Sequence, residues 1–343
     1  MILWLKKWTV WEYLPWWLAN VPVYTFYSWF ALRARHLFFF SNVNPAIPLG
    51  GAVGESKHDI LKLVPDLIKP KTVLVLPDMT FENVRAAMQA IGLDFPVVAK
   101  PDVGERGFLV QKFTAEGPLR QHLERYPVPF LIQEFLTHPL ELSVLFHRFP
   151  DNGRFGVSSI CIKEFLSVTG DGRSSIRQLM AVRPRAAFQL ERFEQENPGL
   201  LDRIPESGEA VLLEPIGNHI RGTKFLNGNH LIEPALEAVF EQVCRQIDGV
   251  LYGRFDLKCA SLEDLLKGSF QVMELNGILA EPAHVYDPQY GVLRAYRDFY
   301  RHWQILFDLH KAQRNRGIRP TSHRAAWQFV QGYFRYKKDL ESR

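Results

Sequence analysis

The stretch that decides the fold is Gly253-Arg254-Phe255-Asp256-Leu257-Lys258, followed by Met273-Glu274-Leu275-Asn276-Gly277. In each half, charged or polar residues alternate with apolar ones, and this period of two is typical of a β-strand. Glu274 and Asn276 are two residues apart, so both side chains project from the same face of their strand. If the two strands pair, Asp256, Glu274 and Asn276 form an all-oxygen cluster of the kind that binds Mg²⁺ together with phosphate oxygens and water. The pattern indicates nucleotide chemistry, and the alternative is that these acids form the solvated face of an edge hairpin.

A glycine-containing loop follows an apolar strand upstream, in Phe95-Pro96-Val97-Val98-Ala99-Lys100-Pro101-Asp102-Val103-Gly104-Glu105-Arg106-Gly107. Gly104 and Gly107 permit close backbone approach, so the loop can turn its amide groups towards phosphate oxygens. Lys100 adds a positive charge for the same phosphates. Turns between strands use the same residue types, so the loop alone is weak evidence. No Gly-Lys-Ser/Thr follows, which disfavours a Walker A motif.

A second apolar segment, Phe130-Leu131-Ile132-Gln133-Glu134-Phe135-Leu136, precedes another acid, Glu141. A buried strand that opens into acidic residues can line an adenosine site, where backbone groups contact the adenine edge. A carboxylate such as that of Glu141 would then accept hydrogen bonds from the ribose hydroxyls. The alternative, that Glu134 and Glu141 are surface strand residues, is favoured by these residues taken alone.

The order of these motifs resembles the ATP-grasp superfamily, including D-alanine–D-alanine ligase and the ATP-grasp module of cyanophycin synthetase. The resemblance covers most of the chain, from residue 55 to residue 305. It implies an α+β fold in which two subdomains grip ATP, subdomain A over 55–128 and subdomain B over 129–310. An aromatic helical arm and a Gly/Pro linker, 1–54, precede them, and a basic helical tail, 311–343, follows.

By this resemblance, the site residues fall into groups with distinct roles. Arg254 faces the reaction centre, and Lys163 contacts both the phosphates and the reacting groups. Asp256, Glu274 and Asn276 hold two Mg²⁺ ions, for which Mn²⁺ is an alternative. The residues implied to bind ATP are Lys57, Lys100, Gly104, Gly107, Gln133, Glu134, Phe135, Leu136, Glu141 and Lys163.

Two further stretches resemble the same family. Val168-Thr169-Gly170-Asp171-Gly172-Arg173-Ser174-Ser175 reads as a turn followed by a helix beginning at Ser175, with Ser174 as its N-cap. Gly217-Asn218-His219-Ile220-Arg221-Gly222-Thr223 occupies the place of an active-site segment in those relatives. The resemblance implies that Asn218, His219, Arg221 and Gly222 contact substrate, although a lone histidine is more often structural. The segment 164–217 is the expected helical lid, and 261–268 is expected to form a longer hairpin tip.

The two ends of the chain differ from its middle in charge and composition. Residues 1–50 carry a net charge of +3 and residues 311–343 a net charge of +7, whereas residues 51–310 carry −6. Six of the eight tryptophans lie in the first 50 residues, and no charged residue occurs from Tyr13 to Leu32. Pro15, Pro22 and the many aromatic residues argue against a membrane span. We therefore expect an arm packed on the catalytic body first, one lying in the membrane interface second, and a span last.

The sequence thus predicts an ATP- and Mg²⁺-dependent carboxylate–amine, or carboxylate–thiol, ligase that forms an acyl phosphate from an amino acid or peptide-like substrate. Two alternatives remain, an ATP-grasp phosphotransferase and a non-catalytic ATP-binding module on a membrane complex. The expected partners are small-molecule carboxylates and amines, a peripheral membrane contact through the arm, and a second copy in a homodimer. No nucleic-acid motif is present. Three widely spaced cysteines fit a cytoplasmic protein, including one bound peripherally at the inner face of the membrane.

Overall fold

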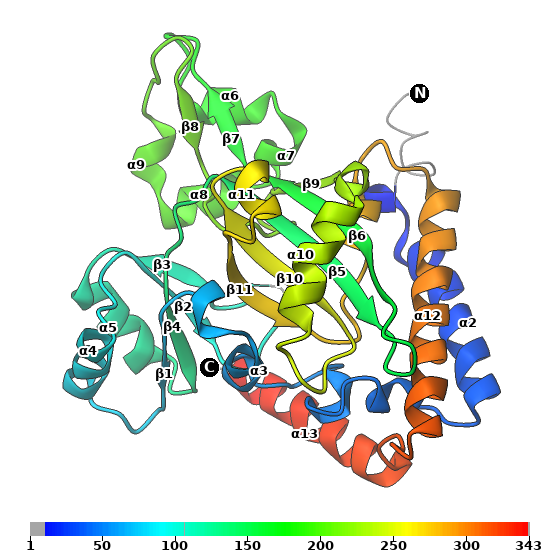
Figure 1. The fold of residues 1–343 in the computed structure, drawn as a ribbon. Helices are drawn as coiled ribbons and strands as arrows, with labels where there is room; N and C mark the ends of the chain where they lie inside the picture. Colours follow the sequence, from blue (N-terminus) through cyan, green and yellow to red (C-terminus); the bar gives the residue numbers. More distant parts are fainter. Residues whose placement is uncertain (1–10, 106, 342–343) are drawn as a thin grey trace. The chain divides into compact units, whose positions relative to one another are not determined.

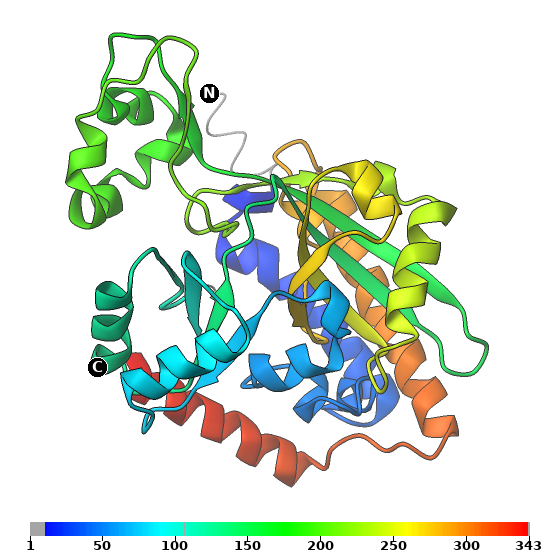
Figure 2. The same ribbon diagram turned by 60° about the vertical axis from the view of Figure 1, so that its left-hand side comes forward.

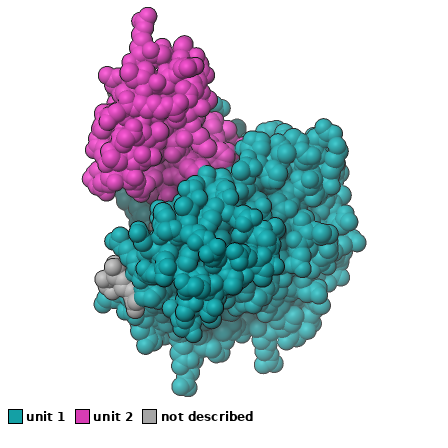
Figure 3. Space-filling model, turned by 90° about the vertical axis from the view of Figure 1, so that its left-hand side faces the viewer, with its two compact units in different colours: residues 1–161, 227–343 teal, residues 162–226 magenta. Residues whose placement is uncertain are grey.

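The computed structural model describes residues 11–105 and 107–341 in two compact units. Unit 1 comprises residues 1–161 and 227–343, and unit 2 comprises residues 162–226 (Figure 3). The chain leaves unit 1 along strand β6 (Phe155–Glu164) and returns along strand β9 (Lys224–Asn227). Unit 2 is therefore an insertion between two neighbouring strands of one sheet.

The larger sheet of unit 1 has the strand order β11-β10-β5-β6-β9. Besides β6 and β9, it contains β5 (Leu140–Arg148), β10 (Tyr252–Cys259) and β11 (Gln271–Asn276). Helices α10 (Pro234–Cys244) and α11 (Leu262–Leu266) cover one face (Figure 1). Phe240 of α10 stacks on Phe255 of β10 and on Phe270. Because side chains alternate along a strand, the charged residues of β10 lie on the opposite face.

The smaller sheet has the strand order β1-β4-β2-β3. Its strands are β1 (Thr72–Val75), β2 (Val97–Pro101), β3 (Gln111–Phe113) and β4 (Phe130–Glu134). Helices α4 (Phe81–Ala90) and α5 (Glu116–Arg125) pack on it through a common apolar core. The side chain of Thr80 caps α4 by accepting a hydrogen bond from the amide of Asn83, which satisfies one of the free donors of the first turn. Together, the two sheets and their helices confirm the expected α+β class.

The aromatic arm forms helix α2 (Trp16–Ala34), which lies along the long helix α12 (Val292–Asn315) (Figures 1 and 2). Phe30 and Phe39 are fully buried, and Phe30 contacts Phe307 with ring centroids 5.4 Å apart. The expected packing of the arm on the body is therefore confirmed. Within the described part of the chain, no helix is both long enough and apolar enough to cross a membrane.

The basic tail forms helix α13 (His323–Glu341), as expected. It crosses unit 1 from the linker, where Tyr333 packs on Gly54, to the smaller sheet, where Leu340 joins the core. Shorter helical turns link the main elements: η1 (Trp11–Tyr13), η2 (Phe39–Asn42), η3 (Pro48–Gly50), α3 (Lys57–Leu63), η4 (Asp66–Ile68), η5 (Asn229–Leu231) and η6 (Ala283–Tyr286).

Unit 2 is built on a two-stranded antiparallel sheet of β7 (Ser167–Thr169) and β8 (Ala210–Leu212). Four short helices complete its apolar core: α6 (Ile176–Ala181), α7 (Pro184–Ala187), α8 (Leu190–Glu196) and α9 (Pro198–Leu201). The predicted lid segment falls within this unit, and its action stays a prediction.

One local expectation from the sequence was wrong, and a second, the longer hairpin tip between β10 and β11, was right but incomplete. Ser175, not Ser174, is the N-cap of α6, in a capping box with Gln178, because the Ser174 hydroxyl donates to Asp171 instead. The segment 261–268 is not a bare hairpin tip. Ser261 caps the short helix α11 there by accepting from the amide of Asp264.

Candidate nucleotide and metal site

One face of the larger sheet carries the acidic signature. Strands β10 and β11 pair antiparallel with Asp256 opposite Glu274 and Arg254 opposite Asn276. The alternation of side chains then puts all four on the same face, which is the face free of α10 and α11. The structure thus brings together the four residues that the sequence placed on two separate strands.

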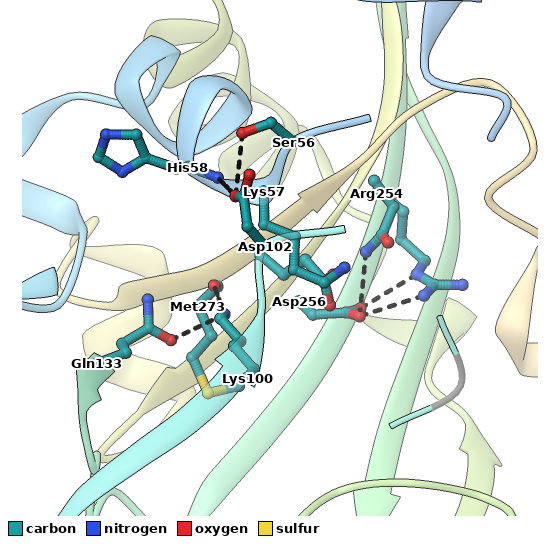
Figure 4. A network of polar contacts seen from close by, with 11 residues as sticks. Ser56, Lys57, His58, Lys100, Asp102, Gln133, Arg254, Asp256 and Met273 are labelled. Atoms are coloured by element: carbon teal, nitrogen blue, oxygen red, sulfur yellow. Dashed lines mark hydrogen bonds and ion pairs between the residues drawn. The ribbon is translucent and has the colours of Figure 1, made fainter. Parts of the chain in front are cut away.

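Asp256 is the best-connected acid of this face. Arg254 donates to both of its carboxylate oxygens from Nε and Nη2, each at 3.1 Å (Figure 4). The Ser143 hydroxyl on β5 donates to Oδ1 at 2.6 Å, and Asn276 Nδ2 donates to Oδ2 at 3.3 Å. A bidentate guanidinium–carboxylate pair is both strong and fixed in direction. Arg254 is therefore held rigidly beside the acid.

Glu274 forms an ion pair with Lys57, whose Nζ lies 2.6 Å from Oε1. Lys57 opens helix α3, and this helix is anchored by Asp102. The Asp102 carboxylate accepts from the Ser56 hydroxyl at 3.0 Å and from the His58 amide at 2.8 Å (Figure 4). Burial lowers the pKa of Lys57, but the neighbouring Glu274 carboxylate outweighs it and raises the pKa overall. Burial likewise opposes ionisation of Glu274, yet Lys57 and Lys100 hold its pKa below the usual value.

Lys100 stands near the end of β2 and points to the same acids. Its Nζ donates to Gln133 Oε1 and to the main-chain oxygen of Met273, each at 3.0 Å (Figure 4). Burial lowers the pKa of Lys100 to about 8, although Glu274 favours the charged form. Both of these hydrogen-bond acceptors are neutral, so an anionic ligand can replace them as the partner of the Lys100 ammonium group.

The donor set fits a hard divalent cation. Among the described residues, no group of three or more His, Cys, Asp or Glu side chains forms a metal cluster. The candidate ligands are instead two facing carboxylates and one amide, Asp256, Glu274 and Asn276. Mg²⁺ is commonly held by one or two carboxylates and completes its shell with water and substrate phosphates. Lys57, Lys100 and Arg254 surround the same acids, which suits a polyanionic ligand.

The residues expected around adenine lie at the junction of the two sheets. Gln133 is the last buried residue of β4, and its side-chain oxygen accepts a hydrogen bond from Lys100. The next residue, Glu134, is exposed. Glu141 is buried, and its carboxylate lies 3.6 Å from Lys258 Nζ, which also donates to the main-chain oxygen of Leu136 at 3.3 Å. Lys112 Nζ lies 3.8 Å from the ring centroid of Phe135. The adenine and ribose roles of these residues stay predictions.

The glycine loop is held from outside by helix α13. Lys337 Nζ forms an ion pair with Glu105 at 2.6 Å, and the Tyr336 hydroxyl lies 3.5 Å from the main-chain oxygen of Val103. Gly107 has a positive φ of 72°, a conformation that favours glycine. Gly104 has open space beside it apart from the ring of Pro101.

The remaining predicted residues lie in unit 2. Lys163 Nζ lies 5.8 Å from the ring centroid of Phe225, which His219 also contacts. Burial lowers the pKa of His219 to about 4, so its imidazole is neutral at pH 7. Arg221 lies 3.6 Å from Glu214. Gly222 has a φ of 99°, and a side chain there would meet Leu166 at 2.9 Å. The structure thus groups Asn218, His219, Arg221 and Gly222 in one turn, and their contact with substrate stays a prediction.

Sequence reasoning missed several contributors. Ser143 and Asp102 were not singled out, although Ser143 lies two residues from Glu141 and this alternation was visible. Lys258 was noted only as part of the strand, yet it is the ion partner of Glu141. The linker was not expected to contribute to the site, but the structure packs Gly51 closely against Gly277, directly after strand β11.

Comparison with known proteins finds matches among solved structures. No protein-family model and no curated protein matches the sequence. Solved structures do match. The ATP-grasp ligase PsnB is 17% identical, and the match covers 64% of this chain and 51% of that one with a TM-score of 0.33.

Two amino-acid ligases show the same likeness. The D-Ala:D-Ser ligase VanG from Enterococcus faecalis is 14% identical, with 80% of this chain and 64% of that one covered and a TM-score of 0.42. The D-alanine–D-alanine ligase from Coxiella burnetii is 9% identical, with 78% and 62% covered and a TM-score of 0.43. The match spans less than two thirds of each of these three proteins. These matching solved structures are an ATP-grasp ligase and D-alanine ligases, the group that the sequence resembles, each with a TM-score below 0.5.

Proposed function

We propose that this protein is an ATP- and Mg²⁺-dependent ligase that joins a carboxylate to an amine, or to a thiol, through an acyl phosphate. One observation carries the proposal: Arg254, Asp256, Glu274 and Asn276 share one face of the sheet, Lys57 forms an ion pair with Glu274, and Lys100 binds the main-chain oxygen of Met273 beside it. Isolated surface acids would not gather three cationic side chains around one buried carboxylate, Asp256, and one half-buried carboxylate, Glu274. The same arrangement supplies what phosphoryl transfer needs, which is positioning and neutralisation of negative charge.

The proposed roles follow from the contacts. Asp256, Glu274 and Asn276 would hold Mg²⁺, which when bound neutralises charge on the transferred phosphoryl group. Lys57 and Lys100 contribute fixed positive charge to the phosphates of ATP. The bidentate pair with Asp256 orients Arg254, which would stabilise the negative charge that develops on the carbonyl oxygen during attack by the nucleophile.

The proposed reaction has two steps. A substrate carboxylate oxygen bonds to the γ-phosphorus of ATP while the bond from phosphorus to ADP breaks. The amine nitrogen then bonds to the acyl carbon, phosphate leaves with the carbon–oxygen electron pair, and the amine gives up its proton. No side-chain nucleophile takes part. Exclusion of water from the acyl phosphate would protect it from hydrolysis, and we assign this task to residues 164–217.

We infer that the amine substrate enters a cavity of about 250 Å³ in unit 1. Its lining includes the carboxylates of Glu12 and Glu281 and the rings of Trp11 and Trp16. Negative charge combined with aromatic faces suits an ammonium group. The main-chain oxygen of Glu281 also accepts from Arg254 Nη1 at 3.4 Å, which links this cavity to the reactive face.

The test is product analysis with ATP, Mg²⁺ and a pool of amino acids. The proposal predicts release of ADP and phosphate that requires two members of the pool. Glu274→Gln should abolish this release, whereas Glu263→Gln, the same change at an exposed position on α11, should leave it intact. ADP release without phosphate would instead reveal a phosphotransferase. ATP binding without turnover of any pool member would favour a binding module.

A further inference from the structure

One face of helix α2 is buried against α12, and the opposite face is exposed to solvent. Its inner face packs on α12 through Phe30, Ala31 and Ala34, all buried. At 3.6 residues per turn, positions 17, 21, 24 and 32 follow one another along the outer face, and position 29 lies at its edge. The large apolar residues there are strongly exposed: Trp17 56%, Val21 50%, Tyr24 55%, Trp29 51% and Leu32 72%. We call these five residues the aromatic face.

Two polar residues of this helix, Asn20 and Thr25, form hydrogen bonds with its own main chain. Asn20 Nδ2 donates to the main-chain oxygen of Trp16 at 2.9 Å, and Thr25 Oγ1 donates to that of Val21 at 2.9 Å. No charged residue occurs from Tyr13 to Leu32. Polar groups that keep internal partners cost little when water is removed from around them. Asn20 and Thr25 therefore keep these bonds when the aromatic face leaves water.

Basic residues gather where the aromatic face ends. Arg33 and Arg35 follow it directly, and Arg33 lies over the rings of Trp29 and Phe307 at 5.9 and 4.8 Å. The end of α12 adds Arg314 and Arg316, both exposed. Arg314 is near enough to His36 for its charge to lower the pKa of that imidazole, together with burial and His323. An uncharged aromatic helix with a cationic end is therefore exposed on one side of unit 1 (Figure 1).

We propose that this surface binds an anionic lipid membrane, with α2 lying in the interface. Tryptophan and tyrosine prefer the interfacial region to the hydrocarbon core. Basic side chains beside an apolar helix face add attraction to anionic headgroups. A second copy of the chain is less well matched, because the aromatic face carries no acidic residue that could pair with the arginines at its end. The inner face stays packed on α12, so this binding needs no unfolding of the arm.

The test is co-sedimentation of the full chain with vesicles of phosphatidylcholine, with and without about one third phosphatidylserine. We expect binding to the anionic vesicles that weakens at high salt. Replacing Trp17, Tyr24 and Trp29 together by serine should lower the partition coefficient by about tenfold or more. The control replaces Leu67, Val182 and Phe188, three apolar residues elsewhere that are even more exposed, by serine and should bind as the unaltered chain does. Arg314→Gln with Arg316→Gln should reduce only the dependence on phosphatidylserine.

Two results would overturn the inference. One is the absence of vesicle binding by the unaltered chain at low salt. The other is a dimer in solution that the Trp17/Tyr24/Trp29 replacement converts to monomers, which would assign the aromatic face to a second copy. The far-ultraviolet circular dichroism spectrum of each variant checks that it is folded. The inference does not depend on the proposed ligase activity, because vesicle binding is measured without turnover.

Discussion

Asp256→Asn is expected to be costly, because Asp256 is the anchor of the polar face. Asparagine keeps the shape of the side chain but removes the negative charge to which Arg254 donates two hydrogen bonds. It also replaces one acceptor oxygen by an NH₂ donor, which would face the Asn276 amide or the Ser143 hydroxyl. Loss of one partner from a buried ion pair costs about 3–5 kcal/mol. Arg254 keeps about a fifth of its side chain exposed, so solvent relieves part of the cost. We therefore expect a loss of about 3 kcal/mol in the free energy of unfolding.

The assay is urea unfolding followed by tryptophan fluorescence. All eight tryptophans lie outside residues 162–226, so this signal reports on unit 1. The midpoint should fall while the slope stays constant. Mg²⁺ with ATP should stabilise the unaltered chain, because a ligand that binds the folded state raises its stability, and should stabilise the variant much less. Asp248→Asn, the same change at an exposed position, is the control.

The reasoning is refuted if Asp256→Asn loses less than about 1 kcal/mol, which is the range of an exposed pair. It is equally refuted if the variant gains as much stability from Mg²⁺ and ATP as the unaltered chain does. The first result would mean that the pair is solvated, and the second that the metal binds elsewhere.

Three further predictions concern Lys100, Asp298 and Gly51. Without metal, the affinity for ATP should fall as pH rises through about 8, because Lys100 then loses the positive charge that binds the phosphates. In a fluorescence titration of ATP binding, Lys100→Arg should make the affinity less dependent on pH. Asp298 accepts hydrogen bonds from His284 and Tyr290, and these outweigh burial and lower its pKa to about 2. Asp298→Asn should therefore cost about 2 kcal/mol at neutral pH, a difference that shrinks as pH falls below about 4 towards 2 in urea unfolding. Gly51→Ala should lower the melting temperature, because φ is 80° and a Cβ would lie 2.8 Å from Gly277; Gly117→Ala, which meets nothing, should not.

The sequence predicted the reactive face because a strand repeats every two residues. Arg254 with Asp256, and Glu274 with Asn276, each share a face whatever the strands pair with. The residues that complete the face depend on pairing across long separations. Ser143 meets Asp256 only because β5 pairs with β10 in one register, and a shift by one residue would have turned it to the other face.

The contacts of Lys57 and of the linker were harder to predict, because the residues that they contact lie far away along the chain. Lys57 was predicted to bind ATP, but the carboxylate with which it forms an ion pair, that of Glu274, is more than two hundred residues away along the chain. The contact between Gly51 and Gly277 involves two glycines, which carry no chemical signal of their own. By contrast, the packed arm was predictable, since twenty uncharged residues rich in aromatic side chains must cover apolar surface somewhere.

The most direct test of the central claim follows one oxygen atom. The protein is incubated with ATP, Mg²⁺ and amino acids whose carboxylates carry ¹⁸O, and the phosphate produced is examined by ³¹P NMR. Formation of an acyl phosphate predicts that each phosphate released carries one carboxylate oxygen. Phosphate without ¹⁸O would mean that water attacks ATP directly, and that result would contradict the account.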